Sequence, residues 1–269
     1  MNSSTKVLLI CILALLLIII NLQDFNYYYN DIIFKTKQVY LSIIYHLLNN
    51  NLLETPINKV NKVAIVTFEN RKNEEFINLH NKNITEYCKK WNYDYLFYDK
   101  CINNVYWCKM FLVLDALKTN KYDYVIWLDS DTIIKKMDVS IDSIVNKYSS
   151  DIFVNYDNGD SLFCAGVFFI KNSEIGKLFM EECIKYYQPH CVNNTGDLNG
   201  MWAGLCYEQG IMNKLIVDSF YKYTTCLPNN IVLNKKINSS MSICNYDTFI
   251  LHLYNSPNSL RAKCFSKYI

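Results

Sequence analysis

Short apolar runs alternate with helical patterns from residue 62 onward, and this alternation constrains the fold more than any other feature. Residues 63–68, 93–98 and 124–128 are short runs rich in apolar and aromatic side chains, as buried strands are. Between them, residues 74–91 and 110–117 place apolar side chains at the spacing of one helix face. This order predicts an α/β fold with a mostly parallel central sheet flanked by helices.

The second half of the chain continues the pattern less regularly. Residues 166–170 and 250–253 are expected to be strands, because each is a short apolar run. Helices are expected at residues 174–187 and 207–215, and residues 188–204 are typical of a loop.

The N-terminus carries an unbroken apolar run of fourteen residues, from Val7 to Ile20. As a helix the run is about 21 Å long, against a hydrocarbon core of roughly 30 Å, and its neighbours bring it near the lower limit for spanning. No small-residue cleavage site follows it. We therefore expect an uncleaved signal anchor, with a cleaved signal peptide or a buried helix as alternatives.

Charges beside the run predict its orientation. Lys6 precedes it, and Asp24 and Asp31 follow, which favours a cytosolic N-terminus and a lumenal remainder. The expected localisation is a single-pass type II membrane protein facing the lumen of the endoplasmic reticulum or Golgi. The expected segments are a cytosolic tail (1–6), a transmembrane helix (7–22), a stem (23–61) and a folded domain (62–269).

The chain has eleven Cys, of which Cys11 lies in the apolar run and ten follow it. In an oxidising lumen some of these ten are expected to pair, with a connectivity that the sequence does not give. No C-x-x-C pair is present, which disfavours a zinc ribbon, and a zinc site at Cys183, His190 and Cys191 is a weaker alternative. Three N-x-S/T sequons would be glycan acceptors in a lumen, at Asn83, Asn193 and Asn238.

Charge and missing motifs exclude several functions. The formal net charge is only +2, so nucleic acid is not an expected partner. The chain has no G-x-G-x-x-G and no G-x-x-x-x-G-K-[ST], so neither a dinucleotide site nor a P-loop is indicated. It also has no G-x-S-x-G, which removes the simplest hydrolase interpretation.

The segment Asp129-Ser130-Asp131 directly follows the apolar run at residues 125–128. Asp129 therefore falls at the carboxyl end of a buried strand, where ligands bind in open α/β sheets. In an extended chain Asp131 would point the same way and Ser130 the opposite way. Two converging carboxylates repel each other unless a cation intervenes, and oxygen ligands favour Mn²⁺ or Mg²⁺. The alternative is an Asp-rich turn that caps the next helix.

The loop that follows the first strand, beginning at Thr67, is expected at the same edge of the sheet. We expect this loop to hold a nucleoside.

Residues 122–132 resemble the central motif of GT-A glycosyltransferases, and most closely the galactosyl-, mannosyl- and xylosyltransferase family called GMA12/MNN10, or glycosyltransferase family 34. Further segments resemble that family in the same order: Trp107-Cys108-Lys109, residues 165–172, Glu208-Gln209 and His252. The resemblance covers roughly residues 62–264. The sequence departs from the family pattern at Cys164, Lys171 and Tyr207.

The resemblance implies a GT-A catalytic domain at residues 62–269 and a metal site. Asp131 would bind the metal directly, Asp129 would contact it through water or bind the donor ribose, and His252 would complete the site. The metal would be Mn²⁺ or Mg²⁺. The alternative for His252 is a packed side chain in a strand.

Further residues are expected to bind the donor. Lys109 would pair with its diphosphate, and the alternative is a solvated helix residue. Glu208 and Gln209 are the expected catalytic pair at the sugar hydroxyls, and the alternative is an ordinary helix N-terminus. Gly166 would let the backbone approach the donor, or would mark a bulge. Thr67 and Ser130 complete the expected donor site.

The implied function is transfer of a hexosyl or pentosyl group from a nucleotide-diphosphate sugar, of UDP-Gal, UDP-Xyl or GDP-Man type, to a glycan or glycoprotein acceptor. The family is described as retaining. One alternative is a catalytically degenerate subunit that binds a nucleotide sugar or glycan. Another is a metal-dependent nucleotidyltransferase, which would need more acids for a second metal ion. The sequence leaves open whether the chain forms a homo- or hetero-oligomer.

Overall fold

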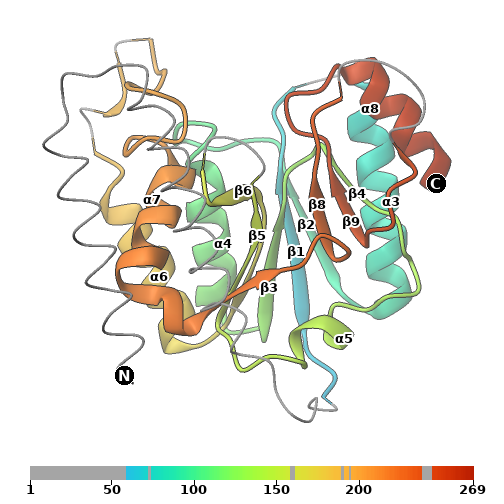
Figure 1. The fold of residues 1–269 in the computed structure, drawn as a ribbon, viewed down its shortest axis with the longest axis horizontal. Helices are drawn as coiled ribbons and strands as arrows, with labels where there is room; N and C mark the ends of the chain where they lie inside the picture. Colours follow the sequence, from blue (N-terminus) through green and yellow to red (C-terminus); the bar gives the residue numbers. More distant parts are fainter. Residues whose placement is uncertain (1–58, 72–73, 158–160, 189–190, 194, 238–243) are drawn as a thin grey trace, which may run out of the picture. The chain divides into compact units, whose positions relative to one another are not determined.

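The computed structural model describes residues 59–71, 74–157, 161–188, 191–193, 195–237 and 244–269 (Figure 1). The expected cytosolic tail and transmembrane helix, almost all of the expected stem, and the sequon at Asn238 lie outside these residues. Within the described part of the chain, no helix is both long and apolar enough to cross a membrane.

The elements expected at residues 62–128 are all present. Parallel strands alternate with helices, and each element lies within a few residues of its expected position. The elements are β1 (Val63–Phe68), α3 (Glu75–Trp91), β2 (Asp94–Tyr98), α4 (Cys108–Lys118) and β3 (Tyr124–Leu128).

The remainder of the chain confirms four expected elements and adds others. The expected ones are β6 (Phe163–Lys171), α6 (Glu174–Lys185), α7 (Glu208–Leu215) and β9 (Ile250–His252). The other elements were not expected from the sequence, and most of them have five residues or fewer. These are β4 (Thr132–Ile134), α5 (Asp142–Val145), β5 (Ile152–Tyr156), β7 (Thr224–Leu227), β8 (Val232–Asn234), α8 (Asn258–Phe265), the π-helical turn Ile216–Phe220 and the 3₁₀ turns Tyr221–Tyr223 and Ser266–Tyr268.

The large sheet has the strand order β2-β1-β3-β6-β5-β7. The pairs β1–β2, β1–β3 and β5–β7 are parallel, whereas β6 is antiparallel to both β3 and β5. Five strands therefore run in one direction and β6 in the other. The expected mostly parallel α/β sheet is confirmed, as a mixed sheet. Because β6 is reversed, its early residues lie beside the carboxyl end of β3, with Val167 opposite Leu128.

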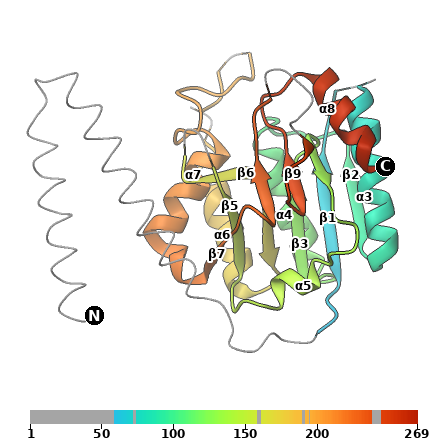
Figure 2. The same ribbon diagram turned by 45° about the vertical axis from the view of Figure 1, so that its right-hand side comes forward.

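Helices cover both faces of this sheet, which explains the continuous apolar runs of β1 and β3. Figures 1 and 2 show α4, α6 and α7 on one side and α3 with α8 on the other. Val63, Ile65 and Ile126 share one buried cluster with Ile84 and Tyr87 of α3. Since both faces of these strands are buried, polar alternation along them is not expected.

A small second sheet, in the order β4-β9-β8, brings the end of the chain back to the large sheet. Strand β9 is antiparallel to β4 and parallel to β8. In this register His252 lies opposite both Thr132 and Asn234. His252 is thus placed next to Asp131, from which it is distant in sequence.

Three disulfides are present among the described residues: Cys101–Cys108, Cys191–Cys206 and Cys244–Cys264. Some pairing was expected, and these are the partners that the sequence could not give. The weaker alternative of a zinc site at Cys183 and Cys191 is wrong, because Cys191 is in a disulfide. Cys183 is a buried free thiol, as are Cys88, Cys164 and Cys226.

The sequon at Asn83 does not fit a glycan acceptor in the folded protein. Asn83 is fully buried on α3, and its side-chain nitrogen donates to the carbonyl oxygens of Ile134 and Tyr268, both at 3.0 Å. Its side-chain oxygen accepts from the Ile134 N–H at 2.9 Å. The amide thus ties α3 to β4 and to the end of the chain. Glycosylation at Asn193 stays a prediction.

We expect Asn83→Ala to lower the free energy of unfolding by about 2–3 kcal/mol, because it leaves buried backbone groups at Ile134 without a partner. Urea unfolding followed by circular dichroism measures this change. Asn78→Ala is the matched control, since Asn78 is an exposed Asn on the same helix, and its effect should stay within about 0.5 kcal/mol. Equal effects of the two substitutions would contradict the assigned role.

Candidate active site

A cavity of about 750 Å³ opens at the carboxyl ends of β1 and β3. The cavity is lined by residues of the loops after these strands, of β6, of the start of α7 and of the β9–α8 connection. Nearly all the expected site residues lie along this cavity: Lys109, Asp129, Ser130, Asp131, Gly166, Glu208, Gln209 and His252. This is the edge at which open α/β sheets bind ligands.

The segment Asp129-Ser130-Asp131 forms a turn. The Thr132 N–H donates to the Asp129 carbonyl oxygen at 3.0 Å, and the Thr132 hydroxyl donates to the same oxygen at 2.8 Å. The segment is therefore not extended, which was the condition for the side-chain directions considered from the sequence. The turn still brings the two carboxylates to one side, while the Ser130 hydroxyl donates to Glu69 Oε2 at 2.6 Å.

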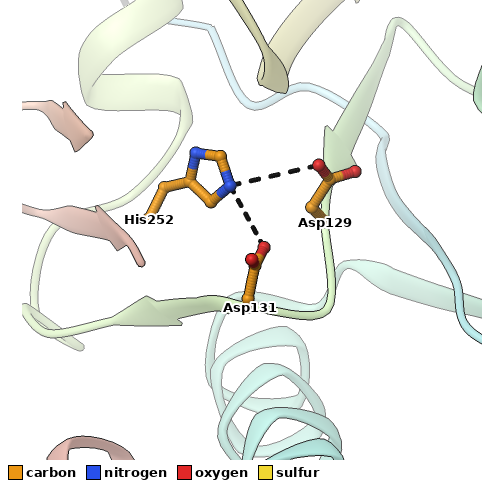
Figure 3. A group of neighbouring side chains, drawn as sticks. All are labelled: Asp129, Asp131 and His252. Carbon is orange, nitrogen blue, oxygen red and sulfur yellow. Dashed lines mark ion pairs between the residues drawn. The ribbon is translucent and has the colours of Figure 1, made fainter. Parts of the chain in front are cut away.

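Asp129, Asp131 and His252 converge on one point (Figure 3). Each offers one ligand atom, and these atoms all lie within 4.8 Å of one another. His252 Nε2 is 3.1 Å from Asp131 Oδ1 and 4.0 Å from Asp129 Oδ2. Two carboxylate oxygens and one imidazole nitrogen are a donor set that fits Mn²⁺ and also accommodates Mg²⁺.

Asn234 fixes the orientation of the His252 ring. Its side-chain nitrogen donates to the Tyr156 carbonyl oxygen at 2.6 Å and to the Asn155 side-chain oxygen, so its own oxygen faces His252 Nδ1 at 2.8 Å. That oxygen can only accept, so Nδ1 carries a proton. In the neutral ring Nε2 then keeps a lone pair directed at the two carboxylates, as a metal ligand requires.

Gly166 provides the space for the His252 ring. A Cβ atom at residue 166 would lie 2.1 Å from His252 Cε1. From the sequence, this glycine was expected to let the backbone approach a donor or to mark a bulge. In the structure it is the imidazole that lies against the glycine, so the absence of a side chain here leaves room for a candidate metal ligand.

We expect Gly166→Ala to weaken Mn²⁺ binding at least about tenfold, because the methyl group displaces the imidazole; tenfold corresponds to about 1.4 kcal/mol. Calorimetric titration of the folded variant measures this affinity. Gly176→Ala is the control. Its Cβ would lie 2.1 Å from the Lys171 carbonyl oxygen, remote from the ligands, so this variant should lose stability and keep its Mn²⁺ affinity. Normal Mn²⁺ affinity in Gly166→Ala would contradict the role.

Asp131 lies between Arg261 and His252. Arg261 Nη2 lies 2.6 Å from Asp131 Oδ2, while His252 approaches Oδ1. Burial opposes the charge of Asp131, but His252 and Arg261 outweigh it and lower the pKa of Asp131 to about 2. Burial also disfavours protonated His252, yet Asp131 overrides it and raises the pKa of His252 well above its usual range. A proton on His252 thus occupies the position that a metal ion would take.

Because a metal ion must displace that proton, we expect Mn²⁺ affinity to rise with pH across a range that lies above the ordinary His value of about 6.5. Binding should release about one proton. Calorimetry in buffers of different ionisation enthalpy, from about pH 6 to about pH 9, measures both quantities. An affinity that stays constant over this range would show that His252 is not a ligand.

Lys109 is buried and bridges two acids. Its Nζ lies 3.1 Å from Asp129 Oδ1, 3.2 Å from Glu208 Oε1 and 3.2 Å from the Ala165 carbonyl oxygen. Burial would lower the pKa of Lys109, but Asp129 and Glu208 raise it above its usual value. The alternative of a solvated helix residue is therefore wrong. Lys109 is a fixed positive charge at the cavity, and its contact with a diphosphate stays a prediction.

Glu208 and Gln209, the expected catalytic pair, have different hydrogen-bonding environments. Glu208 is buried, and its Oε2 is one of two buried side-chain atoms without a hydrogen-bond partner among the described residues. Gln209 is engaged at both ends: its oxygen accepts from the Ala165 N–H at 2.9 Å, and its nitrogen donates to the Ser161 hydroxyl at 2.6 Å. Glu208 therefore has a free acceptor for a ligand hydroxyl, whereas Gln209 holds β6 in place.

Thr67 does not line the cavity. It is fully buried, and its hydroxyl donates to the Leu128 carbonyl oxygen at 2.9 Å, so it joins β1 to β3. The loop after it does reach the cavity, through Glu69 and Arg71. Arg71 pairs with Glu69 at 2.5 Å and lies 3.4 Å from the Ser130 hydroxyl.

Sequence reasoning missed Arg71, Asn234 and Arg261. Each is a single polar residue outside any motif, and the sequence alone offers nothing to distinguish it from a surface residue. Arg261 was missed because α8 was not expected, although the helix buries this Arg and directs it at Asp131.

Residues 58–147 match the model of the galactosyl transferase GMA12/MNN10 family. The segment includes Lys109, Asp129 and Asp131. This match, over about a third of the chain, confirms the family resemblance seen in the sequence and, with it, the expected enzyme class of a glycosyltransferase.

One solved structure supports the fold. The chain is similar to a glycosyltransferase involved in the glycosylation of the major capsid of PBCV-1, at 13% identity and a TM-score of 0.59, over 77% of this chain and 99% of that one. It is also similar to the glycosyltransferase GlyE of Streptococcus pneumoniae TIGR4, at 15% identity and a TM-score of 0.46, over 77% of this chain and 60% of that one. Comparison with curated proteins gives no match.

Proposed function

We propose that this glycosyltransferase moves a hexosyl or pentosyl group from a nucleotide-diphosphate sugar, of UDP-Gal, UDP-Xyl or GDP-Man type, to a glycan or glycoprotein acceptor. The observation that supports this best is the convergence of Asp129, Asp131 and His252 within 4.8 Å in a cavity at the carboxyl edge of the sheet. These residues would hold Mn²⁺ or Mg²⁺.

The charges around the cavity suit a nucleoside diphosphate leaving group. A bound divalent ion would act as a Lewis acid and neutralise charge that develops on the diphosphate. Lys109, Arg71 and Arg261 also line the cavity, each paired with one or two carboxylates, so cationic groups are held close to the place of the diphosphate. The buried position of Lys109 keeps its charge unscreened by water, which makes it more effective at stabilising a developing anion.

The free Oε2 atom of Glu208 is the group we assign to the donor sugar. It can accept a hydrogen bond from a sugar hydroxyl, which satisfies an otherwise unpaired buried oxygen. Its other oxygen stays 3.2 Å from Lys109. The reaction centre would take on oxocarbenium character. We propose a retaining outcome, with the acceptor hydroxyl attacking from the face that the diphosphate leaves.

Two alternative functions have less support. A nucleotidyltransferase with two metal ions would need a second cluster of acids, and the described residues contain one such group. A catalytically degenerate subunit would not need the oriented ring of His252 or the free oxygen of Glu208. We further propose that the N-terminal apolar run anchors the protein as a type II membrane protein, with this domain in the lumen of the secretory pathway.

We expect Asp131→Ala to reduce sugar transfer, and slow donor hydrolysis, by at least about a hundredfold in the presence of Mn²⁺, or about 2.7 kcal/mol of barrier. Removing this carboxylate takes away a ligand and leaves Arg261 without its ion pair. The assay screens UDP-Gal, UDP-Xyl and GDP-Man with and without Mn²⁺.

Asp138→Ala is the matched control for that experiment, because Asp138 is an exposed Asp seven residues further along the chain. It should keep wild-type activity. Transfer by Asp131→Ala within about tenfold of wild type would sink the assignment of this metal site.

A further inference from the structure

Two loops closed by disulfides meet at one side of the cavity mouth. Cys101–Cys108 closes the loop before α4, and Cys191–Cys206 closes the loop before α7. Such cross-links reduce the freedom of the segments that they close. The two loops are therefore a constrained part of the surface.

Hydrogen bonds join the two loops to each other. The Trp107 indole N–H donates to the Cys206 carbonyl oxygen at 2.9 Å, and the Asn104 side-chain nitrogen donates to the Gly196 carbonyl oxygen at 2.8 Å. Trp107 itself is fully buried. The two disulfides and these hydrogen bonds therefore fix the two loops relative to each other.

On this surface lie three aromatic side chains that contact one another edge to face, which we call the aromatic platform: Tyr106, Trp202 and Tyr207. Their ring centroids are 5.5 Å apart for Tyr106 and Trp202, 5.4 Å for Tyr106 and Tyr207, and 5.1 Å for Trp202 and Tyr207. Trp202 is 49% exposed and Tyr106 is 38% exposed. Exposed aromatic clusters of this kind mark binding sites.

The platform is continuous with the proposed catalytic cavity. Tyr106 and Trp202 line that cavity together with the metal-ligand candidates. In the sequence, Tyr106 lies three residues before Lys109 and Tyr207 directly precedes Glu208. The next residue after Trp202, Ala203, has a left-handed backbone with φ of 56°. Non-glycine residues seldom adopt this conformation, and strained residues of this kind cluster at functional sites.

The composition of the two loops indicates which kind of ligand the aromatic platform would bind. Residues 101–107 and 191–207 include one charged side chain, Asp197, and are otherwise rich in Asn, Gly and aromatic residues. Such a surface offers rigid rings for apolar contact together with neutral hydrogen-bonding groups. A sugar ring matches it, because the face of the ring carries C–H groups and its rim carries hydroxyls. An anionic lipid surface would instead call for Lys and Arg.

We propose that the aromatic platform is the acceptor subsite, and that it binds a neutral oligosaccharide by stacking sugar rings on Trp202 and Tyr106. This inference rests on the proposed transferase function and names the acceptor class for the same cavity. The platform positions the acceptor at the cavity mouth, on the side from which Lys109 and Glu208 enter the site.

Calorimetric titration of the full-length chain with neutral hexasaccharides of glucose, mannose, galactose and xylose tests the proposal. At least one should bind, and Trp202→Ala and Tyr106→Ala should each weaken it by at least about tenfold. Trp202→Phe, which keeps a ring, should retain most of the affinity. The matched control is Leu205→Ala, since Leu205 is 62% exposed on the same loop and does not line the cavity. Its affinity should stay within about twofold of wild type.

Mn²⁺ affinity and melting temperature, measured on the same variants, separate this proposal from the proposed function. Both should match wild type, because the platform lies outside the group of metal-ligand candidates. A wild-type chain that binds a hexasaccharide and no Mn²⁺ would overturn the proposed function and support the platform. A chain that binds Mn²⁺ and none of the hexasaccharides, or whose saccharide affinity survives both alanine substitutions, would overturn the platform. So would quenching of Trp202 fluorescence by brominated lipid, which would assign this surface to the membrane.

Discussion

The ion pairs of Asp131 hold the site together. One of its oxygens meets Arg261 of α8 and the other meets His252 of β9. These contacts join the turn after β3 to two elements that are more than a hundred residues further along the chain. A largely buried carboxylate, here with a side chain only 14% exposed, is costly unless cations neutralise it. The return of β9 and α8 to the turn after β3 therefore joins distant parts of the chain and completes the proposed metal site.

The reversed strand β6 is the second feature on which the site depends. Because β6 is antiparallel within an otherwise parallel sheet, its early residues lie at the carboxyl edge. Gly166 can then lie against His252, while its carbonyl oxygen accepts from the Asp129 N–H at 2.8 Å. In a fully parallel sheet the start of β6 would lie at the opposite edge. The mixed topology thus contributes directly to the geometry of the site.

Lys109 and the disulfide-closed loops link the site to the surface. Lys109 lies one residue after Cys108, and Glu208 lies two residues after Cys206. The salt bridge between Lys109 and Glu208 joins α4 to α7 beneath the loops. This buried ion pair therefore connects the two helices whose first turns follow the disulfide-closed loops.

The sequence alone determined the order of the main strands and helices, because short apolar runs and helical spacing of apolar residues depend on local structure. It placed Asp129 at the end of a strand. It also named His252, through family resemblance. Only the tertiary structure decided which side chains meet there: Asn234, Arg261 and Gly166 carry no local pattern and act through partners far along the chain. The same reason explains the failed sequence expectations. The hydroxyl of Thr67 and the amide of Asn83 are bound by backbone groups of distant strands, which no local pattern reports.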